Sequence, residues 1–335
     1  MEITYINSAI KRVNKIQDVW DPKAVTRISF LSKTVVTPES FIPFRGGCLE
    51  HIDGEVEITG TSARELFAGL QYLKDIPSLD MPNVTDMSCM FKGCINFDHP
   101  VTFDTSNVKD MGSMFNGCIS FDRPIDFDTK NVINMNGMFM RCHSFNQPIA
   151  FDTGNVVAMH CMFYECYRFN RLVALNTGKV KYMGNMFYGC ERFNQPLEFK
   201  TKDVTDMSYM FYNCENFNQP VRFNTENVTT TDSMFSGCKS FNQPVDFDTK
   251  NVTDMSNMFN GCTFFNQILI LDTRNVTDMG SMFRNCILLN RSIMFDTGKV
   301  TDMSSMFKGC TNFRQLVAFN TERVEDATDM FCREC

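Results

Sequence analysis

Residues Val252 to Asn275 read VTDMSNMFNGCTFFNQILILDTRN, and close variants of this text fill most of the chain. The leading valine recurs every 24 residues without insertion or deletion, at positions 84, 108, 132, 156, 180, 204, 228, 252, 276, 300 and 324. A fixed period of this length is the signature of a repeat array, in which each unit stacks on its neighbours. The sequence therefore predicts one solenoid in place of the two separate domains that 335 residues could form.

The period divides the chain into four segments. Residues 84–323 hold ten full repeats, and residues 324–335 hold a further half repeat. Residues 60–83 fall on the same positions one period earlier and are predicted to be a degenerate first repeat. Residues 1–59 match no recognised pattern, and we expect this segment to cap the open N-terminal end of the repeat core.

We number the positions of each repeat from its valine and call the residues that share a position a column. Positions 4, 7, 8 and 11 are apolar, as in Met255, Met258, Phe259 and Cys262. This i, i+3, i+4, i+7 spacing predicts one face of a short helix. Asp254 at position 3 is suited to cap the start of that helix. Gly or Asn at position 10 is suited to end it, because both residues tolerate the left-handed conformation.

Positions 18 and 20 are apolar with a variable residue between them, as in Val245 and Phe247, which predicts a short strand with one buried face. Pro244 at position 17 has no amide hydrogen and should stand at the first residue of that strand. One strand and one helical turn cannot bury their apolar faces alone, so neighbouring repeats must stack. The predicted fold class is an α/β repeat solenoid. It is a leucine-rich-repeat-like right-handed coil with one short parallel strand and one short helical turn per repeat.

Composition excludes several other classes of protein. The 33 Phe and 24 Met residues sit at fixed positions of the repeat, which is typical of a packed core and not of a disordered tract. The net charge is -7 and the basic residues form no long run, so we predict no nucleic-acid partner. The start of the chain has no apolar signal region, and no stretch approaches the roughly 20 apolar residues of a membrane helix. We expect a protein that is neither exported by the usual signal nor membrane-spanning.

The wording of the repeat resembles known repeat families. Met-Phe-x-Gly-Cys followed by spaced apolar residues, as in Met258 to Phe265, is similar to the pattern of BspA-type leucine-rich repeats. The chain more closely resembles the Phe/Met/Cys-rich, mycoplasma-type repeats of unknown function, which share the phrases Asn-Val-Thr-Asp-Met-Ser-x-Met-Phe and Phe-Asn-Gln-Pro. Proteins of this kind occur on bacterial surfaces, in protists and in large DNA viruses, and are taken as binding or adhesion modules. The resemblance implies a repeat fold and a binding role, and it transfers no catalytic residue.

Ten of the 15 cysteines occupy position 11, which faces the core of the predicted coil. Side chains in a stacked column run parallel, which is poor geometry for a disulfide, and a buried thiol behaves as a small hydrophobe. We expect these cysteines to be packed as free thiols in a reducing, intracellular compartment. The lone Cys332-x-x-Cys335 pair lacks the second Cys or His pair of a zinc site, so no metal is predicted.

Two polar columns are interpreted as structural. Asn at position 15, as in Asn242, is expected to bond backbone groups of the adjacent coil. Thr at position 22, as in Thr249, is expected to bond within a turn and not to form an ice-binding surface. The four histidines, at positions 51, 99, 143 and 160 of the chain, fall in different columns without a fixed acidic or nucleophilic partner. No triad, paired-carboxylate or phosphate-loop pattern is present, so we predict no enzyme activity and no cofactor.

Variable positions are informative because the core does not dictate their identity. Six of the eight tyrosines lie in three consecutive repeats, and three of them share position 9. Exposed Tyr and Arg residues are typical of interface hot spots, although neutral variation at solvated positions is an alternative explanation. The first candidate interaction patch comprises Tyr164, Tyr167, Arg168, Arg171, Tyr188, Arg192, Tyr209 and Tyr212.

A second candidate patch involves position 19, the variable residue of the predicted strand. Earlier repeats place Asp126, Arg222 or Asp246 there, whereas the last repeats place Ile270 and Met294. Apolar residues on an outward-facing sheet position indicate a contact surface. The sequence therefore predicts an apolar patch on the C-terminal part of the sheet.

Taken together, these observations predict a non-enzymatic scaffold for protein–protein interaction with an unidentified protein partner. The alternative is a structural component of a cell surface or virion, for instance an adhesive repeat protein. The array stops halfway through a repeat without a recognisable polar cap, which favours a homodimer through the C-terminal end. The family resemblance is compatible with a source in a large DNA virus or a protist, and we expect an intracellular protein.

Overall fold

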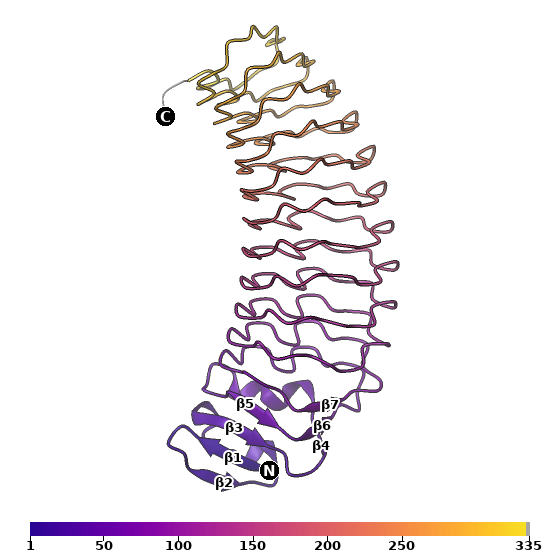
Figure 1. The fold of residues 1–335 in the computed structure, drawn as a ribbon, viewed down its shortest axis with the longest axis vertical. Coiled ribbons are helices and arrows are strands. Elements are labelled where there is room, and N and C mark those ends of the chain that lie inside the picture. The colour runs from indigo at the N-terminus through magenta and orange to yellow at the C-terminus, as the bar shows by residue number, and fades with distance from the viewer. Residues whose placement is uncertain (333–335) are drawn as a thin grey trace. The chain divides into compact units, whose positions relative to one another are not determined.

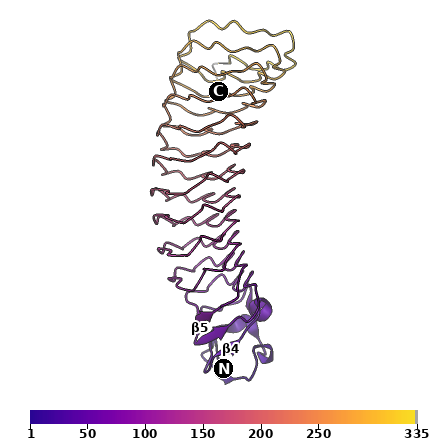
Figure 2. The same cartoon turned by 90° about the vertical axis from the view of Figure 1, so that its right-hand side faces the viewer.

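We describe residues 1–332 of the chain in a computed structural model, in which the chain forms two compact units. The first unit comprises Met1–Val156 and Glu165–Tyr167, and the second comprises Val157–Tyr164 and the described residues from Arg168 on. Within each unit the chain winds into coils of one repeat each, and the coils lie in layers one above the next (Figures 1 and 2). The repeat architecture predicted from the sequence is therefore confirmed, and the hand of the coil stays a prediction.

The regular elements of the described chain all lie before residue 81. A four-stranded sheet has the order β2-β1-β3-β5, in which β1 is antiparallel to both neighbours and β3 is parallel to β5. A parallel three-stranded sheet has the order β4-β6-β7. The strands are β1 (Glu2–Tyr5), β2 (Ile10–Arg12), β3 (Val25–Ser29), β4 (Thr34–Val35), β5 (His51–Asp53), β6 (Glu55–Glu57) and β7 (Ser78–Asp80), and the 3-10 helices are η1 (Ile16–Asp18), η2 (Pro22–Ala24) and η3 (Pro38–Phe44).

Coil stacking already begins inside the segment expected to be a cap. Arg27 of β3 pairs with His51 of β5, and β6 pairs in parallel with β7 of the degenerate repeat. Phe41 of η3 is buried and lies 5.2 Å, centroid to centroid, from Phe67, which occupies position 8 of that repeat. The N-terminal segment thus contacts the first repeat through a tilted aromatic pair, with an interplanar angle of 43°, where successive repeats use stacked pairs such as Phe259 and Phe283.

The predicted helix at positions 3 to 11 is wrong, because no α-helix occurs between residues 1 and 332. Two consecutive four-residue turns replace it, closed by the amides of Met258 and Cys262, which donate to Met255 O at 3.3 Å and Phe259 O at 2.9 Å. The third residue of each turn has a positive φ, +54° at Asn257 and +74° at Gly261, as in type II turns. Paired turns of four residues also direct positions 4, 7, 8 and 11 inward, so they imitate the helical pattern.

Hydrogen bonds between coils explain why the turns prevail over a helix. The amide of Met255 donates to Asp278 O at 3.0 Å, that of Phe259 to Met282 O at 2.9 Å, and that of Gly261 to Arg284 O at 2.7 Å. In an α-helix these amides would donate to carbonyl groups of the same segment, four residues earlier. The turn conformation instead satisfies alternate amides locally and the others through the next coil.

The predicted strand at positions 18 to 20 is also corrected, since no strand is present beyond residue 80 of the described chain. Val221 and Val245 at position 18 form one isolated parallel bridge. Most isolated bridges lie instead at position 3, as between Asp254 and Asp278. Position 3 was predicted to cap a helix, and its carboxylate does bond a backbone amide, since Ser256 N donates to Asp254 Oδ1 at 2.9 Å.

Columns of buried side chains form the interior of each unit. The ring of Phe259 at position 8 is fully buried and lies 5.7 Å from that of Phe235 and 5.8 Å from that of Phe283. Within its own repeat it stacks on Phe265, with the ring centroids 4.5 Å apart. Burying one such side chain stabilises the fold by about 1.5–3 kcal/mol, so the repeated columns supply the main driving force for stacking.

Candidate functional site

Three tyrosines of the first candidate patch form a continuous row on the second unit. The rings of Tyr164 and Tyr188 lie 4.3 Å apart with an interplanar angle of 10°, and those of Tyr188 and Tyr212 lie 4.6 Å apart at 12°. Each residue follows the inward-facing phenylalanine of its coil and is therefore half-buried beside the core. The stacking covers both faces of the Tyr188 ring and one face each of the Tyr164 and Tyr212 rings.

Tyr209 extends this row to a second column. Its ring lies 5.6 Å from that of Tyr212 and 6.4 Å from that of Tyr188. Burial and a hydrogen bond to Asp232 raise the pKa of the Tyr209 phenol, so it stays neutral at physiological pH. We call Tyr164, Tyr188, Tyr209 and Tyr212 the tyrosine row.

The other members of the first candidate patch are placed differently. Tyr167 belongs to the first unit, where its ring lies 4.5 Å from that of His143. Arg168, Arg171 and Arg192 are exposed. Among described residues, no cation–π contact joins Arg168 or Arg192 to a ring of the tyrosine row. The structure therefore groups four of the eight candidate residues.

The second candidate patch lies at the surface, as position 19 requires. Ile270 is 83% exposed and Met294 is 87% exposed. The structure adds two residues that the sequence analysis missed, because Ile268 and Leu316 occupy position 17 and are also exposed. The substitution of the usual Pro at this position was the available signal. We call Ile268, Ile270, Met294 and Leu316 the apolar patch.

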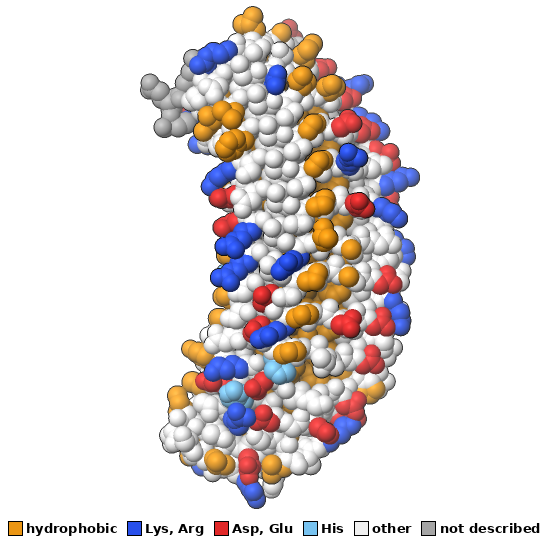
Figure 3. Space-filling view, in the orientation of Figure 1, with side chains coloured by type: hydrophobic (Ala, Val, Ile, Leu, Met, Phe, Trp, Pro, Cys, Tyr) orange, Lys and Arg blue, Asp and Glu red, His pale blue; other side chains and the backbone are white. Residues whose placement is uncertain are grey.

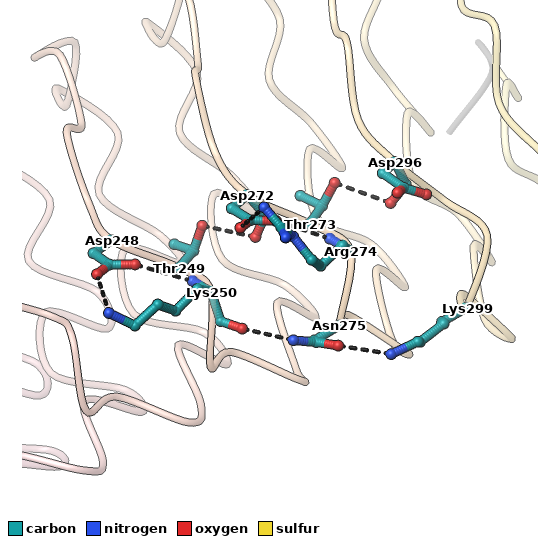
Figure 4. Close-up of polar contacts among 9 residues, drawn as sticks. All are labelled: Asp248, Thr249, Lys250, Asp272, Thr273, Arg274, Asn275, Asp296 and Lys299. Atoms are coloured by element: carbon teal, nitrogen blue, oxygen red, sulfur yellow. Dashed lines mark hydrogen bonds and ion pairs between the residues drawn. The ribbon is translucent and has the colours of Figure 1, made fainter.

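Polar groups link successive coils along the ridge that carries position 22 (Figure 4). Thr249 Oγ1 donates to Asp272 O at 2.9 Å, and Thr273 repeats the bond with Asp296 O. These threonines are buried, so they bond to the neighbouring coil instead of forming an exposed ice-binding array. On the outer side, Asn275 Nδ2 donates to Lys250 O at 2.8 Å.

The position 15 column behaves as the sequence analysis predicted. Asn242 Oδ1 accepts from the amide of Asn266 at 2.9 Å and from Gln267 Nε2 at 3.0 Å. The same pattern joins Asn218 to Asn242. These amides satisfy backbone groups between coils, and their role is structural.

The position 11 cysteines are packed as free thiols. Cys262 has no exposed surface, and its Sγ–H donates to Phe235 O at 3.0 Å. Burial raises the pKa of the Cys262 thiol well above its usual range. Since a thiolate is the reactive form of cysteine, burial makes this thiol a packing group. The sequence analysis predicted no metal at the Cys332-x-x-Cys335 pair, and Cys335 lies outside the described residues.

One histidine has an acidic partner, contrary to the sequence analysis. His51 Nδ1 lies 2.7 Å from Asp75 Oδ2, because the two residues lie one coil apart and their backbones pair. Residues 24 apart in sequence thus meet through stacking, a relation that column positions alone did not reveal. Within residues 1–332, no group of three or more His, Cys, Asp or Glu side chains is arranged to hold a metal ion. None of the helices described has the length and apolarity of a membrane span.

The family model for Mycoplasma protein of unknown function, DUF285, matches residues 61–173, 150–246, 171–269 and 244–334. No curated protein matches the chain. Among solved structures, the chain is similar to a leucine-rich repeat protein from Bacteroides ovatus ATCC 8483. The two share 14% sequence identity over 88% of this chain and 87% of that chain, with a TM-score of 0.38. The family match confirms the resemblance to mycoplasma-type repeats.

Proposed function

This chain belongs to the family described as Mycoplasma protein of unknown function, DUF285, and we propose that it is a non-enzymatic scaffold that binds another protein. The tyrosine row carries this proposal. Buried columns dictate the inward residues of each coil, whereas position 9 lies beside the core and is free to vary. Three successive coils nevertheless place tyrosine there, and the rings stack.

The geometry of the tyrosine row suits a protein partner. Stacked rings lose little conformational freedom on binding, because their neighbours already hold them in place. Tyrosine edges combine apolar area with a hydroxyl group that donates and accepts hydrogen bonds, which is why tyrosine is enriched in interface hot spots.

The alternative proposal is a structural or adhesive component of a surface or particle, in which the row would bind glycans. A sugar ring normally packs against the open face of an aromatic ring. Both faces of Tyr188 are covered, by Tyr164 on one side and Tyr212 on the other. The geometry therefore favours the protein partner, and cell fractionation separates the proposals, since recovery in particles or at a surface would support the alternative.

An intracellular, reducing location is part of the same proposal. The cysteine column supports it, because parallel thiols packed against carbonyl groups are unsuited to bridging. Small exported repeat proteins more often use disulfides.

The proposal is tested by comparing proteins captured by the full chain with those captured by a Tyr164→Ala, Tyr188→Ala, Tyr212→Ala variant. A matched control is Tyr182→Ala, since Tyr182 is exposed in the coil of Tyr188 but no contact joins it to the row. We expect the triple variant to lose a partner, with affinity reduced about tenfold or more, and the control to retain it. An unchanged set of partners in a folded triple variant would refute the proposal.

A further inference from the structure

The apolar patch on the second unit is continuous across three coils. Positions 17 and 19 both point outward, since side chains alternate along an extended segment. In the coil of Val252 these positions hold Ile268 and Ile270, in the next coil Met294 stands at position 19, and in the coil after that Leu316, 97% exposed, stands at position 17. Four large apolar side chains thus gather at positions where most other coils carry proline at position 17 and a charged or small residue at position 19.

The patch borders a hollow of about 670 Å³. Ile270 and Leu271 line it from one coil, Ser292 and Met294 from the next, and Gln315 from the third. Its walls are mostly apolar, with amide and hydroxyl groups at one side. A hollow of this kind accepts apolar side chains of a ligand while leaving its polar backbone near hydrogen-bonding groups.

The charge beside the hollow has one sign. Among the described residues that line it, Arg291 alone carries a charge. Arg314 precedes the lining residue Gln315 in the following coil, and its Nη1 donates to Thr311 O at 2.8 Å and to Phe313 O at 2.9 Å, which leaves its other N–H groups for a ligand. Both arginines are exposed, and no described carboxylate lies within ion-pair distance of either one. Arg291 Nε donates to Asn266 O at 3.1 Å, and this bond fixes the position of the guanidinium group. In Figure 3, blue and red side chains both lie beside orange side chains on the drawn face, so the single sign of charge applies only to the residues that line the hollow.

From this combination we infer that the apolar patch, with Arg291 and Arg314, docks a short amphipathic segment of a partner protein that carries Leu, Ile or aromatic residues next to Asp or Glu. The inference rests on the proposed scaffold function and assigns it a second, chemically defined site. The apolar side chains supply contact area, and the arginines select a carboxylate through bidentate hydrogen bonds. Met294 adapts to side chains of different shape, because its thioether is flexible and polarisable.

The arginines beside the apolar patch favour a peptide with carboxylates over a second copy of the chain as the occupant. A two-fold dimer places the same surface on both sides of its interface. Arg291 and Arg314 would then be buried against a second copy of the same surface, whose hollow has no carboxylate among the described residues of its lining, and burying an unpaired charge is costly.

An anionic membrane is also a poorer match. Stable attachment to such a surface needs a larger basic cluster or a lipid anchor, and the chain has a net charge of -7.

The test uses the full chain and a phage-displayed library of random 16-residue peptides. At about 3.3 Å per extended residue this length exceeds the roughly 15 Å of three coils and leaves flanking residues on both sides. One variant combines Ile270→Asp with Met294→Asp. Asp126 and Asp246 already occupy position 19 elsewhere, so the fold tolerates these changes. A second variant combines Arg291→Gln with Arg314→Asn, which restores the residues common at positions 16 and 15. The control is Thr102→Asp, an exposed position 19 residue of the first unit.

We expect the selected peptides to combine apolar residues with Asp or Glu. Their dissociation constants, measured by fluorescence polarisation, should rise about tenfold in both variants, stay unchanged in the control, and rise with salt. Equal enrichment on the Ile270→Asp/Met294→Asp variant, or selection of peptides without carboxylates, would overturn the inference.

Three further outcomes would overturn the peptide-docking role of the apolar patch without refuting the proposed scaffold function. Peptide binding that depends on the tyrosine row but not on Ile270 and Met294 would support the scaffold and overturn the site. Patch-dependent dimerisation in light scattering would assign the patch to a second copy. Patch-dependent sedimentation with vesicles of phosphatidylcholine and phosphatidylserine would assign it to lipid.

Discussion

Asp278 shows how stacking alters the chemistry of a single residue. Partial burial, followed by the nearby charges of Asp254 and Asp302, raises the pKa of its carboxyl group. Because the pKa of this carboxyl is higher in the folded than in the unfolded state, its protonated form is more compatible with the fold than its charged form. The stability contribution is therefore present at low pH and is lost as the pH rises through the folded pKa.

We predict that Asp278→Asn raises the melting temperature slightly at pH 7, because the variant removes a charge that the fold disfavours. The amide should still accept from Gly280 N, as Asn134 Oδ1 accepts from Asn136 N at 3.0 Å. The gain should shrink as the pH falls through the raised pKa, where wild-type Asp278 is protonated. Thermal unfolding between pH 3 and pH 7 measures both effects.

Asp326→Asn provides the matched comparison. Backbone and side-chain hydrogen bonds from Thr328 lower the pKa of the Asp326 carboxyl, so the fold favours its charge. Its contribution is present above the unfolded pKa and is lost as the pH falls through the folded pKa. This variant should not gain stability at pH 7, and equal stabilisation by both substitutions would contradict the electrostatic explanation.

The cysteine column gives a second prediction at the residue scale. At pH 8, iodoacetamide should leave the ten position 11 thiols unmodified in the folded protein, because their raised pKa values and burial suppress the thiolate. Partly exposed Cys48 serves as the reference site. Mass spectrometry after denaturation should show all column thiols reacting. If the position 11 thiols of the folded protein reacted with iodoacetamide as fast as Cys48, the prediction that they are shielded from solvent would be wrong.

At the scale of elements, the paired turns are the feature that the sequence pattern concealed. Position 10 does not distinguish a helix from paired turns, because a glycine with positive φ, such as Gly261 at +74°, suits both a helix end and a type II turn. Position 6 does discriminate, since it would lie inside a helix, yet Ser281 has a φ of +55°. Small residues at position 6, including Gly137, were the available but unused signal.

We predict that Ser281→Gly makes the protein more stable by about 0.5 to 1 kcal/mol, because glycine relieves the left-handed strain and outweighs its own entropic cost. In a helix the same change would destabilise by a comparable amount. Ser281→Ala is the companion variant, which would stabilise a helix but brings no gain in the turn. Urea unfolding of both variants distinguishes the two structures through the sign of the change.

Arg141 and Glu165 show that inter-coil contacts can impose the turn without a favourable residue. Both stand at position 10 with positive φ values of +60° and +56°. They belong to the first unit, where Arg141 Nε lies 3.1 Å from Glu165 Oε2. The surrounding coils therefore hold the turn even where its own residues disfavour it.

At the scale of the whole molecule, the direction of the backbone bonds bears on the proposed C-terminal homodimer. In the coils that begin at Val204 to Val300, the amides at positions 4, 6 and 8 donate forward, as Phe307 N does to Met330 O at 2.8 Å. In the described chain, the equivalent amides of Ala327, Asp329 and Phe331 have no partner. The same edge also presents carbonyl groups, because the position 2 carbonyl accepts from the next coil, as Thr277 O does from Thr301 N at 2.8 Å. Among side chains, Phe331 is 51% exposed and available to a homodimer contact.

We predict that such a dimer, measured by light scattering over a concentration series, disappears in Phe331→Glu. The variant would place a carboxylate of each copy inside the contact, where burial without a cationic partner is costly. Phe264→Glu, at an exposed phenylalanine of another coil, should leave association unchanged. A wild-type chain that remains monomeric at the highest concentration would end the homodimer proposal.

The sequence by itself determined the period, the residues that face the core and the family, because stacking makes every column obey the same packing constraint. The inward positions, such as Phe259 and Cys262, could be assigned from spacing alone. Only the tertiary structure decided that these positions lie on turns, that His51 meets Asp75, and that Ile268 and Leu316 join Ile270 and Met294. Each of these depends on hydrogen bonds or contacts between residues about one period or more apart, and local spacing carries no information about such bonds.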